Sequence, residues 1–300
     1  MHSIFLCVIN EIISSVEIRS FHLLFWSGTT SLLQYLSNYT NTHREEKCEM
    51  VIGDAPLLVN HLYDPIKNLT RGIKCPQDIS SELSLLNYAK YFPNTKLVVG
   101  LRHLILWFES LYNFHSSRSS TPILPTSKLT KRCIAGSQGV CAWRANFADF
   151  LSRLGKTPRM SIEEENLLAL NLPVVPGFTG HIFLYDVSQL SNKQHDDDNN
   201  KELVTSFRKD LANFLGIKFE LDEIPFLNAA EHDHFRLKYQ IKICDDEHKE
   251  IRAVLLDMAK KTSKWIRKYF LASDDVFVSS RNEFIEIMER WVKDPCELNV

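Results

Sequence analysis

The 300-residue sequence lacks several features that mark common classes of protein. Its apolar stretch at residues 4–13 is interrupted by Asn10 and Glu11, is too short to span a bilayer and follows no basic segment, so it is a poor signal peptide or membrane anchor. The loop Gly-x-x-x-x-Gly-Lys-Ser/Thr is missing, which argues against a kinase or NTPase. Cys-x-x-Cys spacing is missing as well, so no metal site is expected.

A strong charge of either sign is also missing. The formal net charge of -2 argues against a general attraction to nucleic acid or to an anionic surface, although it is compatible with a local basic cleft. The hydrophobic content of 44% and aromatic content of 11% are enough to bury one substantial core. We therefore expect one domain over residues 21–300, preceded by a poorly defined N-terminal extension over residues 1–20.

The seven cysteines leave the redox environment open. Six remain if Cys7 belongs to a targeting segment, and an even number is compatible with an oxidising compartment. Cys133 and Cys141 flank a turn that contains glycine, and the sequence favours their pairing and their remaining unpaired equally.

Apolar runs alternate with helical periodicity along the chain, which predicts an α/β fold with a central, mostly parallel sheet flanked by helices. The run at residues 97–101 is nearly continuously apolar, as a strand covered on both faces should be. Strands are expected at residues 21–26, 50–52, 97–101 and 181–186, and helices at residues 29–39, 83–92, 104–115, 203–215, 247–270 and 282–291.

Two stretches that follow predicted strands have the residues of a phosphate or sulfate site. The first is Ser27-Gly28-Thr29-Thr30-Ser31, where a glycine and several hydroxyls stand at the start of a predicted helix, although the same pattern also makes an ordinary helix N-cap. The second begins with Arg102, at the end of the strand at residues 97–101, and continues to Ser110 in the next helix. Ligands collect at the carboxyl ends of parallel strands, so an arginine fork and a hydroxyl there suit a second phosphate. His103, beside Arg102, either ends the strand loop or acts as an acid–base group.

Together these stretches resemble the sulfotransferases that use 3'-phosphoadenosine 5'-phosphosulfate (PAPS). The resemblance is to the carbohydrate-acting branch, which includes the heparan-sulfate type and related algal sulfotransferase-like proteins. It covers about residues 21–295 and includes Gly53-Asp54-Ala55-Pro56 and Phe214-Leu215-Gly216-Ile217. It implies a P-loop-like three-layer fold in which Ser27, Gly28, Thr29, Thr30 and Ser31 hold the 5'-phosphosulfate. Arg102 and Ser110 would hold the 3'-phosphate, and Lys238 would belong to the basic loop that folds over it.

The resemblance further implies transfer of a sulfuryl group from PAPS to a hydroxyl or amine of an acceptor, a carbohydrate above all, with 3',5'-ADP as the product. Family members are commonly Golgi glycoproteins with one membrane anchor, so a Golgi lumen or membrane location follows by analogy alone. The acceptor triplets at Asn38 and Asn68 are compatible with a lumenal protein.

The sequence departs from the family where the chemistry is done. Trp26 stands where the family has its catalytic lysine, and losing such a charge can cost on the order of a hundred- to a thousand-fold in rate. No catalytic base can be assigned, because the short interval at residues 34–52 offers only His43, Glu45, Glu46 and Glu49. The basic loop lacks its usual Arg-Lys-Gly signature around Lys238. The alternative is therefore a relative that binds nucleotide or glycan without turnover.

Overall fold

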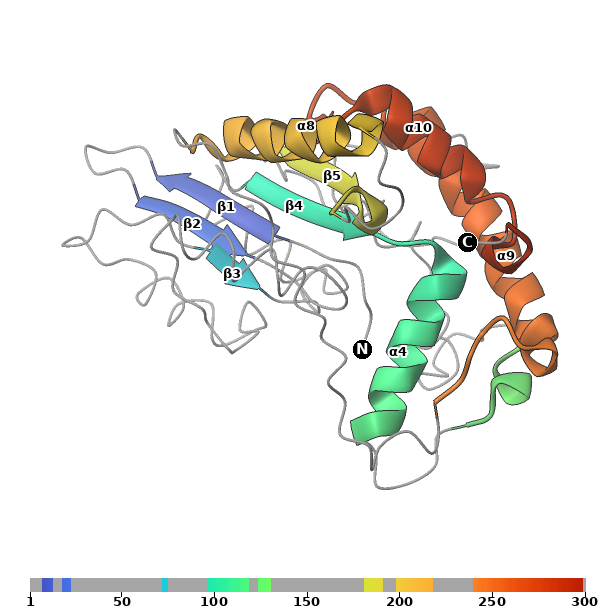
Figure 1. Ribbon diagram of the computed structural model, residues 1–300. Helices are drawn as coiled ribbons and strands as arrows, with labels where there is room; N and C mark the ends of the chain where they lie inside the picture. Colours follow the sequence, from blue (N-terminus) through green and yellow to red (C-terminus); the bar gives the residue numbers. More distant parts are fainter. Residues whose placement is uncertain are drawn as a thin grey trace, which may run out of the picture.

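The computed structural model describes residues 7–12, 18–22, 72–74, 96–118, 124–130, 181–190, 198–217 and 240–298 (Figure 1). The described ranges form an α/β structure. The strands are β1 (Cys7–Ile12), β2 (Ile18–His22), β3 (Gly72–Lys74), β4 (Lys96–Leu101), β5 (Ile182–Asp186) and β6 (Val276–Val278). The helices are α4 (Leu104–Arg118), α8 (Asp198–Leu215), α9 (Lys249–Trp265) and α10 (Arg281–Arg290).

The strands form a single sheet in the order β2-β3-β1-β4-β5-β6. Strands β4, β5 and β6 are parallel neighbours, so their carboxyl ends lie at the same edge. Strand β1 is antiparallel to β4, and it is also antiparallel to β2 and β3. The expected parallel arrangement is therefore confirmed for β4–β5–β6, whereas the part of the sheet around β1 is mixed.

The N-terminal segment differs from the expectation of a poorly defined extension. Strand β1 and most of β2 lie within residues 1–20, and β2 overlaps the strand expected at residues 21–26 only in its last two residues. The register places Asn10 opposite Ser20 and Glu11 opposite Arg19. The polar residues that interrupt the apolar stretch therefore stand opposite polar residues of the neighbouring strand, a long-range match that a search for local periodicity does not detect.

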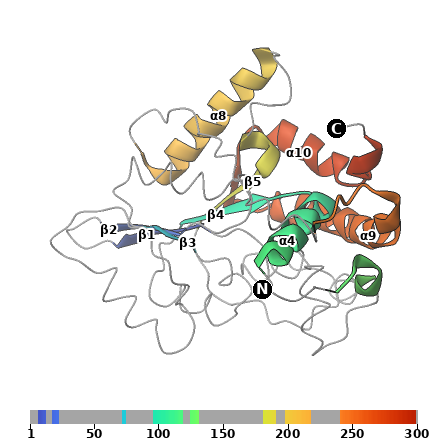
Figure 2. The same ribbon diagram turned by 60° about the horizontal axis from the view of Figure 1, so that its bottom comes forward.

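Helices cover both faces of the β4–β5 part of the sheet, because the side chains of a strand alternate between its faces. Leu97 and Val99 belong to one apolar cluster with α4, α9 and α10, whereas Val98 belongs to a second cluster with α8. Figure 2 shows α8 on one side of β4 and β5, with α4 and α9 toward the other. The nearly continuous apolar run of β4 is explained by this double coverage.

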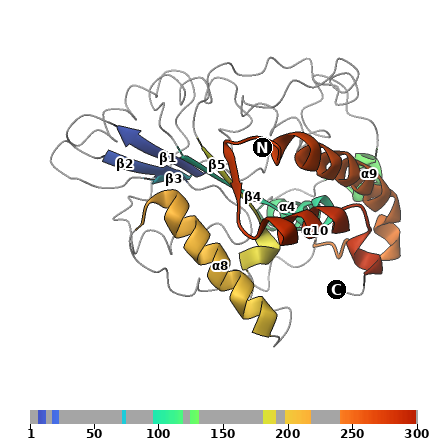
Figure 3. The same ribbon diagram turned by 90° about the horizontal axis from the view of Figure 1, so that it is seen from above.

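The helix ends follow ordinary stop signals. Helix α8 ends at Gly216, whose φ of 72° is the left-handed conformation that glycine adopts readily. The amide of Ile217 then donates to the carbonyl of Ala212, which is the hydrogen bond that closes a helix ending at a glycine. Helix α8 begins at Asp198, five residues before the predicted start, so the acidic residues that precede the predicted helix extend it. Helix α9 continues into a π-helical turn, Ile266–Phe270, and Figure 3 shows α9 and α10 packed together beyond the strands.

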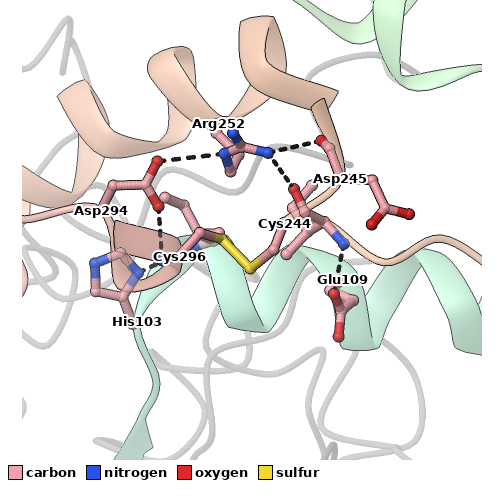
Figure 4. Close-up of a disulfide and its surroundings, with 9 residues drawn as sticks. His103, Glu109, Cys244, Asp245, Arg252, Asp294 and Cys296 are labelled. Atoms are coloured by element: carbon pink, nitrogen blue, oxygen red, sulfur yellow. Dashed lines mark hydrogen bonds and ion pairs between the residues drawn. A yellow bond between two sulfur atoms is a disulfide. The ribbon is translucent and has the colours of Figure 1, made fainter. Parts of the chain in front are cut away.

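A disulfide and an ion pair tie the C-terminal turn to the start of α9 (Figure 4). Cys244 is bonded to Cys296, which lies 52 residues further along the chain. Arg252 on α9 donates to the carbonyls of Ile243 and Asp245, both at 2.8 Å, and pairs with Asp294 at 3.3 Å.

The pairing of Cys133 with Cys141, which the sequence left open, lies outside the described residues. None of the helices in the described ranges is both long and apolar enough to cross a membrane.

Candidate functional site

The candidate site is the edge of the sheet at which the parallel strands β4, β5 and β6 end. Arg102 directly follows β4, Asp186 is the last residue of β5, and Ser279 directly follows β6. Asp186 is the register partner of Leu101, the residue before Arg102. Residues from distant parts of the chain therefore meet at the position where open α/β sheets bind their ligands.

Asp186 is the most deeply buried charged group at this edge. Its Oδ1 accepts hydrogen bonds from the backbone amide of Ser188 at 2.9 Å and from the Ser188 hydroxyl at 2.6 Å, and Trp291 adds a side-chain hydrogen bond. Its Oδ2 is buried and has no hydrogen-bond partner among the described residues. Burial raises the pKa of Asp186, while the hydrogen bonds and the charge of Arg102 act in the opposite direction.

Arg102 lies at the rim of the sheet, where most of the residue is buried. Burial lowers the pKa of Arg102, and the nearby carboxylates of Asp186 and Glu109 counteract this. The Glu109 carboxylate is itself engaged, because its Oε2 accepts a hydrogen bond of 2.6 Å from the amide of Ile243. Arg102 is thus a cation between two carboxylates, one held by the backbone and one with an unpartnered oxygen.

Ser110, the second predicted phosphate ligand, lies in the second turn of α4 and is partly exposed. The same helix anchors the chain that follows Lys238: Asn113 exchanges two hydrogen bonds with the backbone of Ile241, at 2.7 and 2.9 Å. Lys238 itself lies outside the described residues. The described chain nevertheless resumes two residues later, against the helix that carries Ser110.

The third strand contributes a polar network. The Gln189 side chain accepts from the amide of Asp186 at 3.0 Å and donates to the carbonyl of Ser279 at 3.2 Å, so it links the ends of β5 and β6. The Ser279 hydroxyl donates to Asp210 of α8 at 2.7 Å. Glu283 in the first turn of α10 has its pKa raised by burial and, to a smaller extent, by the neighbouring charges of Glu286 and Asp186.

His103 is a structural residue rather than an acid–base group. It precedes the first residue of α4, and its Nδ1 accepts from the amide of Ile105 at 3.3 Å, which makes it the helix N-cap. An amide donor at Nδ1 places the ring proton on Nε2, which lies 3.3 Å from the carbonyl oxygen of Trp291. Burial lowers the pKa of His103 to about 4, so the imidazole is neutral near pH 7.

The other predicted site residues lie outside the described residues: Ser27, Gly28, Thr29, Thr30 and Ser31. The same is true of Trp26 and of residues 34–52, which contain the candidate catalytic bases. Sequence reasoning missed Asp186 and Gln189 at the edge. The available signal was the acid that directly follows the apolar run 182–185, because a carboxylate at the carboxyl end of a buried parallel strand belongs to the ligand-binding edge.

Within the described ranges, no group of three or more His, Cys, Asp or Glu side chains is arranged to hold a metal ion. Comparison with protein-family models, with curated proteins and with solved structures found no match for the chain. An arginine guanidinium can bind an anion through two parallel hydrogen bonds, and the charges of Asp186 and Glu109 offset that of Arg102.

Proposed function

We propose that the chain is a sulfotransferase-like protein that binds PAPS or its product 3',5'-ADP, with the 3'-phosphate at Arg102. The observation that carries this proposal is the position of Arg102 directly after the central parallel strand β4, with α4 beginning two residues later. The strand, the arginine and the hydroxyl of Ser110 then follow in the order of the sequence pattern that resembles the family. The finer fold assignment, a P-loop-like three-layer domain with Ser27 to Ser31 at the 5'-phosphosulfate, is part of the same proposal.

Two further observations support this arrangement. Helices cover both faces of β4 and β5, and the carboxyl edge of parallel strands is where α/β sheets bind their ligands. The two hydrogen bonds between Asn113 and Ile241 anchor the segment after Lys238 to the helix of Ser110. Ile241, three positions after Lys238, is therefore held against α4 one turn beyond Ser110.

The proposed reaction is transfer of the sulfuryl group to a hydroxyl or amine, with a carbohydrate as the proposed acceptor. The acceptor oxygen or nitrogen attacks sulfur in line, the bond from sulfur to the bridging phosphate oxygen breaks, and 3',5'-ADP leaves. The activated group comes with the donor, and the protein contributes position and charge. Trp26 has no cation to stabilise the bridging oxygen, so we propose that turnover is impaired.

Selective stabilisation by nucleotide tests the donor site. A ligand at about a hundred times its dissociation constant should add roughly 2.7 kcal/mol to the free energy of unfolding. We expect 3',5'-ADP to raise the melting temperature more than 5'-AMP or ATP does, and Arg102→Ala to abolish the difference. Arg267→Ala is the matched control, because Arg267 is exposed and pairs with Glu289 of α10, which is not part of the proposed site. An equal response to the three nucleotides would contradict the proposal.

The second candidate function is binding of nucleotide or glycan without turnover, and the observation that favours it is Trp26 in place of the lysine. A sulfation assay on Trp26→Lys, with Trp26→Met as the control that adds no cation, separates the two. Activity that appears with lysine alone identifies the natural chain as a binding protein. Activity in the unmodified chain identifies an enzyme that uses another cation.

We also propose that the protein folds in an oxidising compartment, in keeping with the Golgi lumen of the resembling family. The support is the disulfide between Cys244 and Cys296, because such bonds are rare in proteins of the reducing cytosol. Expression in a eukaryotic cell tests this location: glycosidase treatment should increase the electrophoretic mobility of the chain, and Asn38→Gln with Asn68→Gln should remove that increase. Glycan-free material from the secretory pathway would contradict the glycoprotein assignment.

A further inference from the structure

We propose that an anion bound by Arg102 is bound together with a proton, which Asp186 takes up on Oδ2. The inference rests on the proposed function, since it takes Arg102 as the ligand of the 3'-phosphate. It adds a property that the proposed function does not require: the affinity for the nucleotide depends on the protonation state of a residue that does not contact it.

The first step is the position of the proton. Oδ1 of Asp186 already accepts from the amide and the hydroxyl of Ser188, at 2.9 and 2.6 Å. Oδ2 is buried and has no hydrogen-bond partner among the described residues. An ionised carboxylate with one oxygen in that state is costly, because burial penalises the charge and the donors of Ser188 and Trp291 offset this only in part. A proton on Oδ2 removes the charge and leaves both hydrogen bonds from Ser188 to Oδ1 intact.

The second step is the set of charges that face Asp186. Within the described part of the chain these are Arg102, after β4, which favours the ionised form, and Glu283 on α10, which opposes it. Trp291 and Ser188 supply neutral donors. Glu283 in turn faces Arg290 and Glu286 of its own helix. Among the described residues Arg102 is therefore the cation that favours ionised Asp186, although the hydrogen bonds from Ser188 and Trp291 favour it more strongly.

The third step is the effect of the ligand. A phosphate that binds Arg102 brings negative charge to the one cation that favours ionised Asp186. Like charges close together disfavour ionisation, so the bound state holds a proton on Asp186 more tightly than the unbound state does. Linkage then requires the reciprocal effect: protonation of Asp186 must strengthen the binding of the anion.

The experiment is calorimetric titration of the full chain with 3',5'-ADP in pairs of buffers that differ in ionisation enthalpy, which gives the number of protons taken up. The variants are Asp186→Asn, which is permanently neutral and keeps Oδ1, and Asp257→Asn as the matched control. Asp257 is an exposed carboxylate that pairs with Lys261 on α9, so this control makes the same change of charge elsewhere. The 3'-phosphate titrates itself, with a pKa of about 6, so titration by phosphorus NMR of the bound nucleotide in each variant separates its proton from that of Asp186.

We expect the unmodified chain and Asp257→Asn to take up more protons than Asp186→Asn does, and to lose affinity more steeply as the pH rises, because the pKa of Asp186 is raised by its burial. At a pH where Asp186 is ionised, Asp186→Asn should bind about five-fold tighter or more, within the usual range of coupling between sites. If Asp186→Asn does not fold, Glu283→Gln takes its place: removing this opposing charge should move the proton uptake to lower pH.

The remaining outcomes would contradict either the proton linkage or the proposed function. Equal proton uptake in the unmodified chain and Asp186→Asn, or an unchanged profile in Glu283→Gln, overturns the proton linkage and leaves the proposed function in place. Weaker binding by Asp186→Asn at every pH overturns it too, and would mean that Asp186 orients Arg102. No binding by any variant overturns the proposed function, and the linkage falls with it.

Discussion

Gly100 of β4 and Tyr185 of β5 are register partners, and the Tyr185 ring occupies the space that a side chain at position 100 would need. A β-carbon on Gly100 would lie 2.6 Å from Oη and 2.7 Å from Cζ of Tyr185. Such distances are too short for non-bonded contact, and the ring is fully buried. The glycine therefore allows the central strands to carry a large aromatic residue directly before Asp186.

The first prediction follows from this contact. Gly100→Ala should destabilise the chain by about 1–3 kcal/mol, as overpacking of a well-packed core does. Urea denaturation followed by circular dichroism measures the change. The same substitution in a Tyr185→Leu background should cost less, because the shorter side chain leaves room for the methyl group. An equal cost in both backgrounds would show that the clash with Tyr185 is not the cause.

The second prediction concerns the disulfide between Cys244 and Cys296. Replacing both residues by serine should lower the free energy of unfolding by about 2–4 kcal/mol, because the bond closes a long loop in the unfolded chain. Urea denaturation measures this, and peptide mapping under non-reducing conditions should recover the two cysteines in one linked pair. Unchanged stability, or recovery of the two peptides separately, would contradict the pairing.

The third prediction compares two arginines. Arg252 is nearly buried and bonds to two carbonyls as well as Asp294, whereas Arg267 makes an exposed pair with Glu289. Arg252→Ala removes the ionic partner of the partly buried Asp294 carboxylate and leaves two carbonyls without their donor, so it should cost about 3 kcal/mol. Arg267→Ala should cost less than about 1 kcal/mol, as surface ion pairs do. Similar costs for the two, measured by urea denaturation, would mean that the network around Arg252 is no stronger than a surface contact.

The parts of the fold that the sequence predicted are those determined by local patterns. The apolar run that became β4 and the stop at Gly216 were both predicted from neighbouring residues. Strand β1 was missed because its polar residues match partners on another strand, and the start of α8 because acidic residues also suit a loop. Local periodicity contains no information about such pairings.

The candidate site shows the same limit. Arg102 was predicted because it follows a strand in its own segment, whereas the role of Asp186 depends on β5 lying beside β4, about eighty residues away. The pairing of Cys244 with Cys296 depends on how the chain returns from α10 to α9, and the spacing of cysteines does not specify connectivity. Knowledge of the neighbouring strands and helices was needed in each case.

The fourth prediction is the pH dependence of stability that His103 causes. Its pKa is about 4 in the folded chain and about 6.5 in the unfolded chain, so the folded state favours the neutral ring. The contribution of the neutral His103 to the free energy of unfolding is therefore fully present above about pH 6.5. It is lost as the pH falls toward about pH 4, where the loss reaches about 3 kcal/mol. His103→Asn keeps an acceptor for the amide of Ile105 but does not titrate there. Asp186 and Glu283, whose pKa values are raised, change stability in the opposite sense as the pH falls, but they do so in both proteins. Subtracting the urea-derived free energies of the two proteins at each pH should isolate the contribution of His103. A difference that does not vary with pH over this window would mean that His103 is not held neutral by its burial and its role as a helix cap.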